Sequence, residues 1–190
     1  MAFLSHEQLN EIGFSSLGHN VLISDKASIY GASRIHIGSN VRIDDFCVLS
    51  AGEGGIYIGD FIHIAVYSSL IGSGRIVISD YAGISSRVSI YSSSDDYSGE
   101  YMSNPTVPAE YTNVMKADVT IGRHAIIGCG AIVLPGVTIH DGVAIGALSL
   151  VAKDCDEFGV YSGNPARKML MRKRDLLEKE RDLMGNIQRK

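Results

Sequence analysis

The sequence has no long apolar run and few cysteines, and each absence excludes a class of protein. No stretch of its 190 residues is long and apolar enough to cross a membrane. The first eight residues lack a basic segment followed by an apolar one, so we expect no signal peptide. The three scattered cysteines, Cys47, Cys129 and Cys155, argue against a disulfide framework and favour a reducing compartment. We therefore expect a soluble cytoplasmic protein with a single domain, 1–190.

Positive charge is also scarce over most of the chain. The sequence has 17 Lys and Arg against 21 Asp and Glu, for a formal net charge of −4 at pH 7. No basic patch with interleaved aromatic residues occurs, so we expect no nucleic-acid partner. The exception is the end of the chain: from Pro165 onward, 9 basic residues stand against 4 acidic ones. Such a basic tail could meet the phosphate of a ligand.

What the sequence does have is a six-residue spacing of aliphatic residues through most of its length. It is clearest at Ile121, Ile127, Val133, Ile139, Ile145 and Val151. The same phase fits positions 37, 43 and 49, then 58, 64 and 70, then 78, 84 and 90. Neither a helical period of 3.6 nor simple alternation produces this spacing. It predicts an all-β solenoid, in which each turn buries its apolar positions by stacking on its neighbours.

Three hexads make one triangular coil, and the coils predict where the chain leaves the solenoid. The coil starts are Leu17, Ile37, Ile58, Ile78, Ile121 and Ile139, which gives about six coils over residues 17–155. The interval from the fourth start to the fifth is 43 residues, far more than one coil needs. We therefore predict a long inserted loop at about 93–117. Insertions in repeat proteins often lie on the binding face, so we expect this loop to contact the substrate.

The two ends of the chain do not follow the repeat. Residues 1–16 form a predicted cap, because Ser5 and Gln8 match a capping box and Gly13 can close the short helix that follows. Residues 165–190 are rich in Leu, Met, Arg, Lys and Glu, with apolar residues at helical spacings. We predict a C-terminal helix over this range.

The hexads, the loop and two closing segments, Val151–Asp154 and Tyr161–Arg167, resemble the hexapeptide-repeat acyltransferases. The pattern is most similar to the galactoside and maltose O-acetyltransferase branch, which includes sugar acetyltransferases of surface-polysaccharide pathways. This resemblance implies a left-handed parallel β-helix, an exception to the usual right-handed crossover. It also implies acetyl-CoA as co-substrate, no metal, and a homotrimer with active sites between adjacent subunits.

The resemblance further implies that the coenzyme lies along the C-terminal coils, with its pantetheine arm held by backbone amides at small residues. The corresponding positions here are Gly128, Cys129, Gly146 and Ala147. An extended arm needs close backbone approach, although a tight solenoid corner could by itself exclude larger residues. The residues that match basic groups near the coenzyme's phosphates are Lys153, Arg167 and, as a further candidate, Lys168. Ile126 replaces an aromatic residue that many relatives carry, so that coenzyme contact is lost or replaced.

The general base is the point at which the sequence departs from the family. Acetyl transfer needs a group that removes a proton from the acceptor, and this group is usually His. Relatives supply it from the inserted loop, where this chain has Asp95 and no His. Asp95 or Asp96 is the first candidate, His63 near a corner one coil earlier is the alternative, and an acceptor that needs no strong base is the third possibility. Loop acids are otherwise solvated or turn-forming, and a corner His can simply bond a backbone carbonyl.

Acids and tyrosines together in the inserted loop favour recognition of sugar hydroxyls. The candidate substrate-binding residues in the loop are Tyr97, Glu100 and Tyr101. Tyr67 and Ser68 are added to them because they follow His63 and lead into the next face of the coil.

The leading functional hypothesis is an acetyl-CoA-dependent O-acetyltransferase that acts on a sugar hydroxyl in surface-polysaccharide biosynthesis. The alternative is N-acetylation of a nucleotide-linked amino sugar, because an amine can arrive nearly neutral and demand less of a base. A non-catalytic β-helix scaffold is more remote, since a scaffold needs no coenzyme-binding ending. A metal-dependent solenoid hydratase would use three His ligands across a subunit interface, and this sequence has no His pair at short spacing.

Overall fold

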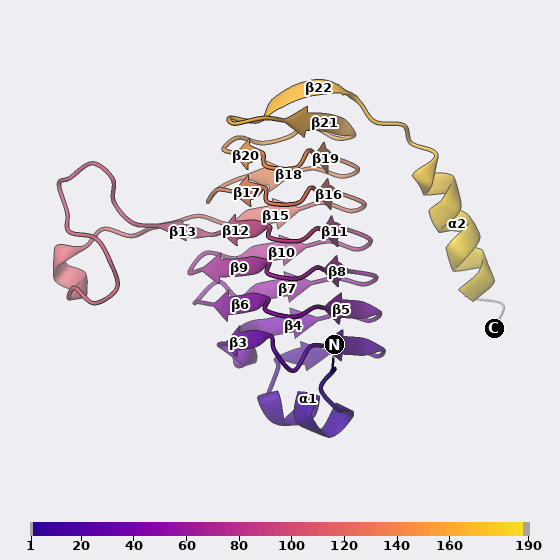
Figure 1. Ribbon diagram of the computed structural model, residues 1–190, viewed down its shortest axis with the longest axis horizontal. Coiled ribbons are helices and arrows are strands. Elements are labelled where there is room, and N and C mark those ends of the chain that lie inside the picture. Colours follow the sequence, from indigo (N-terminus) through magenta and orange to yellow (C-terminus); the bar gives the residue numbers. More distant parts are fainter. Residues whose placement is uncertain (1, 188–190) are drawn as a thin grey trace.

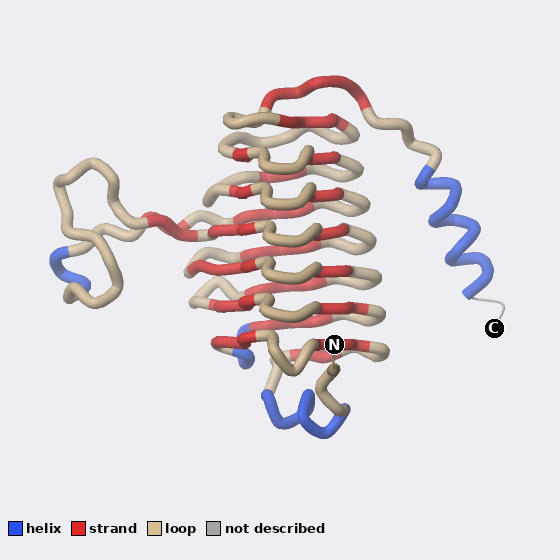
Figure 2. Tube along the Cα trace, viewed as in Figure 1, coloured by secondary structure: helices blue, strands red, loops and turns tan. Residues whose placement is uncertain are grey.

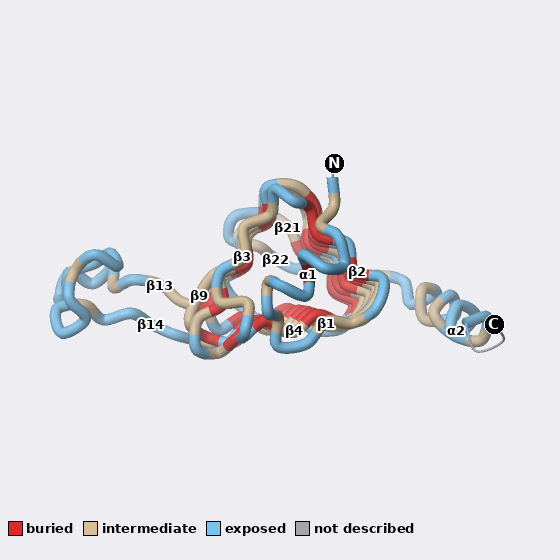
Figure 3. Tube along the Cα trace, turned by 90° about the horizontal axis from the view of Figure 1, so that it is seen from below, coloured by how far each residue is buried: buried red, intermediate tan, exposed pale blue. Residues whose placement is uncertain are grey.

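The protein is a parallel β-solenoid of triangular cross-section (Figures 1 and 3). The computed structural model describes residues 2–187. Six complete coils wind about the axis, and part of a seventh follows them. Each complete coil contributes one strand to each of three sheets, which we call the first, second and third faces. The strands are short and the corners between them are turns (Figure 2).

The three faces are stacks of strands from successive coils. The first face contains β1 (Ser16–Leu17), β4 (Ile35–Ile37), β7 (Ile56–Ile58), β10 (Ile76–Ile78), β15 (Val119–Ile121) and β18 (Thr138–Ile139). The second contains β2 (Val21–Ile23), β5 (Val41–Ile43), β8 (His63–Ile64), β11 (Gly83–Ile84), β16 (Ile126–Ile127), β19 (Ala144–Ile145), β21 (Gly159–Ser162) and β22 (Arg167–Met171). The third contains β3 (Ser28–Tyr30), β6 (Val48–Ala51), β9 (Ser69–Gly72), β12 (Ser89–Tyr91), β17 (Ile132–Val133) and β20 (Leu150–Val151).

The hexad residues form the core, as the spacing predicts. Each strand points its aliphatic hexad residue inward, and these side chains lie directly above one another in adjacent coils, as Ile43, Ile64 and Ile84 do on the second face. All three are almost completely buried. Burying an isoleucine contributes about 1.5–3 kcal/mol, so the repeated stack supplies most of the driving force for folding.

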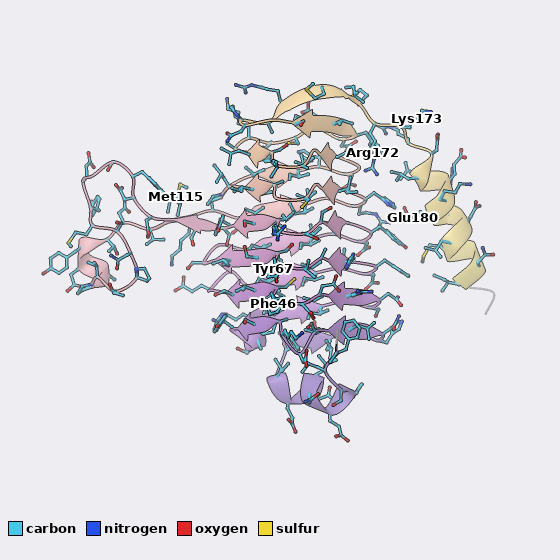
Figure 4. All side chains as sticks on the ribbon, in the orientation of Figure 1. Phe46, Tyr67, Met115, Arg172, Lys173 and Glu180 are labelled. Atoms are coloured by element: carbon cyan, nitrogen blue, oxygen red, sulfur yellow. The ribbon has the colours of Figure 1, made fainter. Side chains whose placement is uncertain are left out.

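The turns between the second and third faces form what we call the second corner. Phe46, Tyr67 and Arg87 occupy equivalent positions there with left-handed backbone, with φ near 60°. Phe46 and Tyr67 lie one above the other (Figure 4), and their rings stack with centroids 5.0 Å apart. The Arg87 guanidinium lies over Tyr67. Contacts along this ladder offset the cost of the unusual backbone in each turn.

The N-terminal cap has the geometry that the sequence predicts. Helix α1 (His6–Ile12) begins with a complete capping box between Ser5 and Gln8 and ends at Gly13 in the left-handed conformation. Leu9 is buried against the first coil. The helix therefore covers an edge that would otherwise expose apolar core and unpaired strand groups.

The inserted loop leaves the solenoid after the fourth coil. It contains the short hairpin of β13 (Ser93–Ser94) and β14 (Met115–Lys116), followed outward by the 3₁₀ turn η2 (Ala109–Tyr111). Beneath it, strands of the fourth and fifth coils pair directly, with β10 on β15, β11 on β16 and β12 on β17. The loop projects from the corner between the third and first faces (Figures 1 and 3).

The C-terminal segment differs from the single helix predicted over 165–190. Residues Arg167–Met171 form β22, which pairs antiparallel with β21, and helix α2 spans Leu176–Ile187. Positions 188–190 of the predicted helix lie outside the described residues. The prediction was wrong for the first part because strand β21 ends the solenoid with an open edge. Pairing with that edge outweighs the helical propensity of Leu and Met. The seventh, partial coil that carries β21 was also not predicted.

Helix α2 contacts the coils through a few polar groups. Glu180 accepts hydrogen bonds from Arg123 and from His124, whose Nε2 lies 2.7 Å from its carboxylate. The bond from His124 holds the pKa of Glu180 below its usual value. The Tyr81 hydroxyl also lies 3.2 Å from the Met184 sulfur. Across the described chain, neither helix is long and apolar enough to cross a membrane.

Candidate active site

A basic cavity lies near the end of the solenoid, where the sequence predicts the coenzyme's phosphates. It has a volume of about 170 Å³ and is lined by Lys153, Arg167 and Lys168 together with Tyr161 and Ala166. Lys168 is neutralised by Asp156, at 3.0 Å, and this hydrogen bond raises the pKa of the lysine. Within residues 2–187, neither Lys153 nor Arg167 has an acidic partner. Two positive charges are therefore available to an anionic ligand.

The predicted pantetheine positions lie below this cavity, on the second corner. The amides of Gly128 and Gly146 donate to carbonyls of the next coil, at 2.8 and 2.7 Å. The amides of Cys129 and Ala147 make no hydrogen bond within the described chain, and both residues are exposed. If backbone amides hold an extended ligand here, Cys129 and Ala147 supply them.

Coil stacking, by itself, explains why two of these residues are glycine. A Cβ on Gly128 would lie 2.6 Å from the backbone nitrogen of Ala147, and one on Gly146 would lie 2.7 Å from the Ser162 hydroxyl. The structure therefore favours the tight-corner explanation for these two glycines over direct contact with a ligand.

One coil below Gly128, the second corner carries hydroxyl groups and opens into a cavity. Ser85 and Ser86 take the corner positions there, and their hydroxyls have no hydrogen-bond partner in residues 2–187. The cavity beside them has a volume of about 320 Å³, and His63, Gly83 and Ile126 also line it.

His63 is held in this cavity by a carboxylate that the sequence analysis did not single out. Its Nε2 lies 2.8 Å from Asp44, whose other oxygen accepts a hydrogen bond from Arg42 at 2.7 Å. Asp44 is buried, which by itself raises its pKa, but the bonds from His63 and Arg42 outweigh burial and leave that pKa lowered. The ionised Asp44 therefore fixes the imidazole by its Nε2 and leaves Nδ1 for another partner.

Asp95 lies elsewhere, in a cavity beneath the inserted loop. This cavity has a volume of about 740 Å³ and is lined from the coils by Tyr30 and Arg34 and from the loop by Asp95 and Asn104. Asp95 is exposed, and its carboxylate makes no hydrogen bond within the described residues. It is thus free to contact a ligand.

The other predicted loop residues do not share this environment. Asp96 accepts hydrogen bonds from the amide and hydroxyl of Ser98 and from Asn113, and the hydroxyl bond lowers its pKa. These bonds engage its carboxylate in holding the loop together. Tyr97 is 92% exposed, and Glu100 and Tyr101 are also exposed.

Two further predicted substrate residues lie at the second corner. Ser68 is completely buried, and its hydroxyl donates to the Ser85 carbonyl at 2.9 Å, so it cannot meet a substrate. That prediction was wrong because the position after the corner turns inward to bind the adjacent coil. Tyr67 is half exposed, but both faces of its ring are covered by Phe46 and Arg87, which leaves only its edge and hydroxyl.

One chain thus carries two separate groups of candidate residues. The corner amides and Ser85 follow the second corner, with Arg167 above them on β22 and His63 beside them on the second face. Lys153 lies in the turn from the third face to the first, which is also the corner of Asp95 and the inserted loop. No described group of His, Cys, Asp and Glu in residues 2–187 could hold a metal ion.

Known proteins share both the sequence and the architecture. The bacterial transferase hexapeptide (six repeats) pattern matches residues 118–153. A dTDP-4-amino-4,6-dideoxy-D-glucose acyltransferase from Escherichia coli is 64% identical over 180 residues, which are 95% of this chain and 94% of the relative. The chain belongs to the hexapeptide-repeat acyltransferases. The predicted family, acyltransferase activity, acyl-CoA co-substrate and left-handed β-helix are confirmed.

Two further acyltransferases help to rank possible acceptors. AntD, an N-acyltransferase from Bacillus cereus solved with dTDP and 3-hydroxybutyryl-CoA, is 45% identical, with a TM-score of 0.93 and 98% of each chain covered. A putative lipopolysaccharide biosynthesis O-acetyl transferase, WbbJ of Escherichia coli K12, is 29% identical over 76% of this chain and 72% of its own. The similarity is thus stronger to N-acyltransferases.

The basic cavity of this acyltransferase gives a direct prediction. Lys153→Ala and Arg167→Ala should each weaken acetyl-CoA binding by about 1–2 kcal/mol, because each loses one charged contact. Lys168→Ala is the matched control and should have a smaller effect, since Asp156 already neutralises that lysine. The dissociation constants of wild type and variants are measured by calorimetric titration with acetyl-CoA and with its 3′-dephospho analogue. The difference in affinity between wild type and each variant should be smaller with the analogue, which lacks one phosphate. Unchanged affinity in both variants would reject the cavity as the phosphate site.

Proposed function

We propose that this chain transfers an acyl group from a coenzyme A thioester to the amino group of a dTDP-linked 4-amino-4,6-dideoxy sugar. The observation that carries the proposal is the 64% identity, over nearly the whole chain, to an acyltransferase named for that acceptor. A serine-to-alanine variant of AntD has been solved with dTDP-4-amino-4,6-dideoxyglucose and coenzyme A, which supports the same acceptor. O-acetylation of a sugar hydroxyl, the leading hypothesis from the sequence, has only the more distant relatives in its support.

The working unit in this proposal is a homotrimer with its sites between subunits. In a single chain, the second corner, where the coenzyme is expected, and Asp95 lie at different corners of the triangle. Neither group of candidate residues is therefore a complete active site. The second corner also exposes large apolar side chains: Phe46 is 46% exposed, Tyr67 52% and Leu148 77%. In the trimer, the inserted loop of one subunit would cover the second corner of its neighbour and bring Asp95 to the thioester.

The chemistry follows from the residues that meet there. The amine must give up a proton as its nitrogen attacks the thioester carbonyl, and the C–S bond then breaks to release coenzyme A. Asp95 accepts that proton. Variants of AntD have been solved with a serine and an aspartate replaced, ten residues apart in its sequence. Ser85 and Asp95 are also ten residues apart, which favours them as the corresponding active-site residues of this chain. Asp95 is favoured over Asp96 because the Asp96 carboxylate is already hydrogen-bonded within the loop.

A matched pair of acceptors tests this function. Coenzyme A release is measured with dTDP-4-amino-4,6-dideoxyglucose and with the same nucleotide sugar carrying a hydroxyl in place of the amine. We expect kcat/KM to be at least about a hundredfold higher for the amine, because a neutral amine attacks a thioester more readily than a hydroxyl and demands less of a general base. Equal or faster transfer to the hydroxyl, or to a simple galactoside, would restore the O-acetyltransferase hypothesis. No thioester consumption with any acceptor would favour the scaffold.

A further inference from the structure

Gly83 is unusual among the glycines of the solenoid. The other glycines in the described coils either have a left-handed backbone or would bring a Cβ within 3.0 Å of a neighbouring atom. Gly83 has neither reason: its φ is not left-handed, and a Cβ there would meet nothing within 4 Å. A strand glycine without a local cause often marks the close approach of a ligand or of another chain.

The position of Gly83 makes it a gap in a row of outward side chains. On the second face, register places His63 one coil below it and Ile126 one coil above it. The Ile126 side chain is 45% exposed, so it forms an apolar wall on one side of the gap. The gap opens into the cavity of about 320 Å³ whose rim includes Ala65 and Ser85.

The same cavity lies at the lower end of the path that we infer for the coenzyme along the second corner. Arg167, which lines the basic cavity, pairs with Ser162 above the second corner. Descending that corner, successive coils present Ala147, then Cys129, then Ser86, about 4.8 Å apart. Phosphates held at the basic cavity leave the pantetheine arm to run down this line. The thiol end then reaches the level of Ser85 and Ser86, beside the gap.

From this geometry we propose that the gap at Gly83 is an acyl-chain pocket, and that the enzyme accepts acyl groups longer than acetyl, at least as large as butyryl. The proposal rests on the proposed function, because it assumes a thioester at the second corner. Ile126 packs against the chain, and the absent side chain of Gly83 provides its space. Gly83 is therefore a specificity-determining residue and takes no part in proton transfer.

The test compares acetyl-, propionyl- and butyryl-CoA with the wild type and with Gly83→Val, using dTDP-4-amino-4,6-dideoxyglucose as acceptor. Wild type should use butyryl-CoA at least as well as acetyl-CoA. Gly83→Val should lower the butyryl to acetyl ratio of kcat/KM about tenfold or more while retaining acetyl transfer. Thr120→Val, an outward strand position on the first face, is the control and should leave the ratio unchanged.

Three outcomes would overturn the pocket. The first is a wild-type kcat/KM for butyryl-CoA more than about a hundredfold below that for acetyl-CoA. The second is a butyryl to acetyl ratio that does not change in Gly83→Val. The third is loss of the oligomer in Gly83→Val, which would assign the gap to a neighbouring subunit. Calorimetric affinities for the three thioesters test the pocket without any acceptor, so they separate failure of the pocket from failure of the proposed acceptor. If the amino sugar is not acylated but Gly83→Val weakens butyryl-CoA selectively, the pocket stands and the proposed acceptor falls.

Discussion

Replacing Asp95 with Asn is expected to lower the turnover number at least about a hundredfold with an amine acceptor, because a general base contributes about 10² to 10⁴ in rate. The Asn side chain keeps the shape and the contacts of Asp95 but cannot take the proton. The exposed carboxylate makes no hydrogen bond within the described chain, so its replacement should leave folding unchanged. Steady-state kinetics at saturating acceptor and coenzyme, with sedimentation to check the oligomer, make the measurement.

Asp96 and His63 supply the controls for this experiment. Asp96→Asn should change the Michaelis constant for the acceptor more than the turnover number, because Asp96 holds the loop through Ser98 and Asn113. If Asp95→Asn keeps near-normal turnover and His63→Ala loses it, the base is His63 oriented by Asp44. Normal turnover in all three variants would mean that the amine needs no base from the protein.

The second large effect concerns stability, and it should appear when Gly54 is replaced with Ala. A Cβ at Gly54 would lie 2.3 Å from the backbone nitrogen of Arg75 and 2.5 Å from the carbonyl carbon of Gly74, in the next coil. Backbone cannot swing aside as a flexible side chain can, so the two coils must separate locally. We expect a loss of about 1–3 kcal/mol in the free energy of unfolding, the usual cost of overpacking.

Gly83→Ala is the matched control for Gly54→Ala, because its Cβ meets open space. Urea titration followed by circular dichroism should show a change within about 0.5 kcal/mol for that variant. Equal stability of the two variants would show that the turn at Gly54 can relax, so that contact between coils is not the reason for glycine at this position.

The coils could be predicted from sequence because their core positions repeat. An inward residue such as Ile64 meets its equivalents in the coils above and below, so one register satisfies every hexad at once. In the C-terminal segment, the local sequence pattern and the tertiary contacts favour different structures. Its composition favours a helix locally, but the open edge of β21, which no local pattern reveals, recruits residues 167–171 as a strand.

The candidate site was predictable only where a local motif carried it. Lys153 and Arg167 belong to motifs near the end of the repeat, and they line one cavity. Asp44 and Gly83 went unnoticed because their roles depend on residues one coil away, 19 or more positions along the chain. The serine at position 85, where the next two coils have Gly128 and Gly146, was a signal that could have been read.

Direct pairing of the coils on either side of the inserted loop has an evolutionary consequence. Strands of the fourth and fifth coils are in register as though the chain had never left, so the scaffold does not depend on what the loop contains. Loop length itself adds little to the free energy of folding, since doubling it costs about 0.6 kcal/mol. Exchange of residues 93–117 between homologues should therefore leave the coils folded, so this one segment is free to vary in length and sequence under a constant fold.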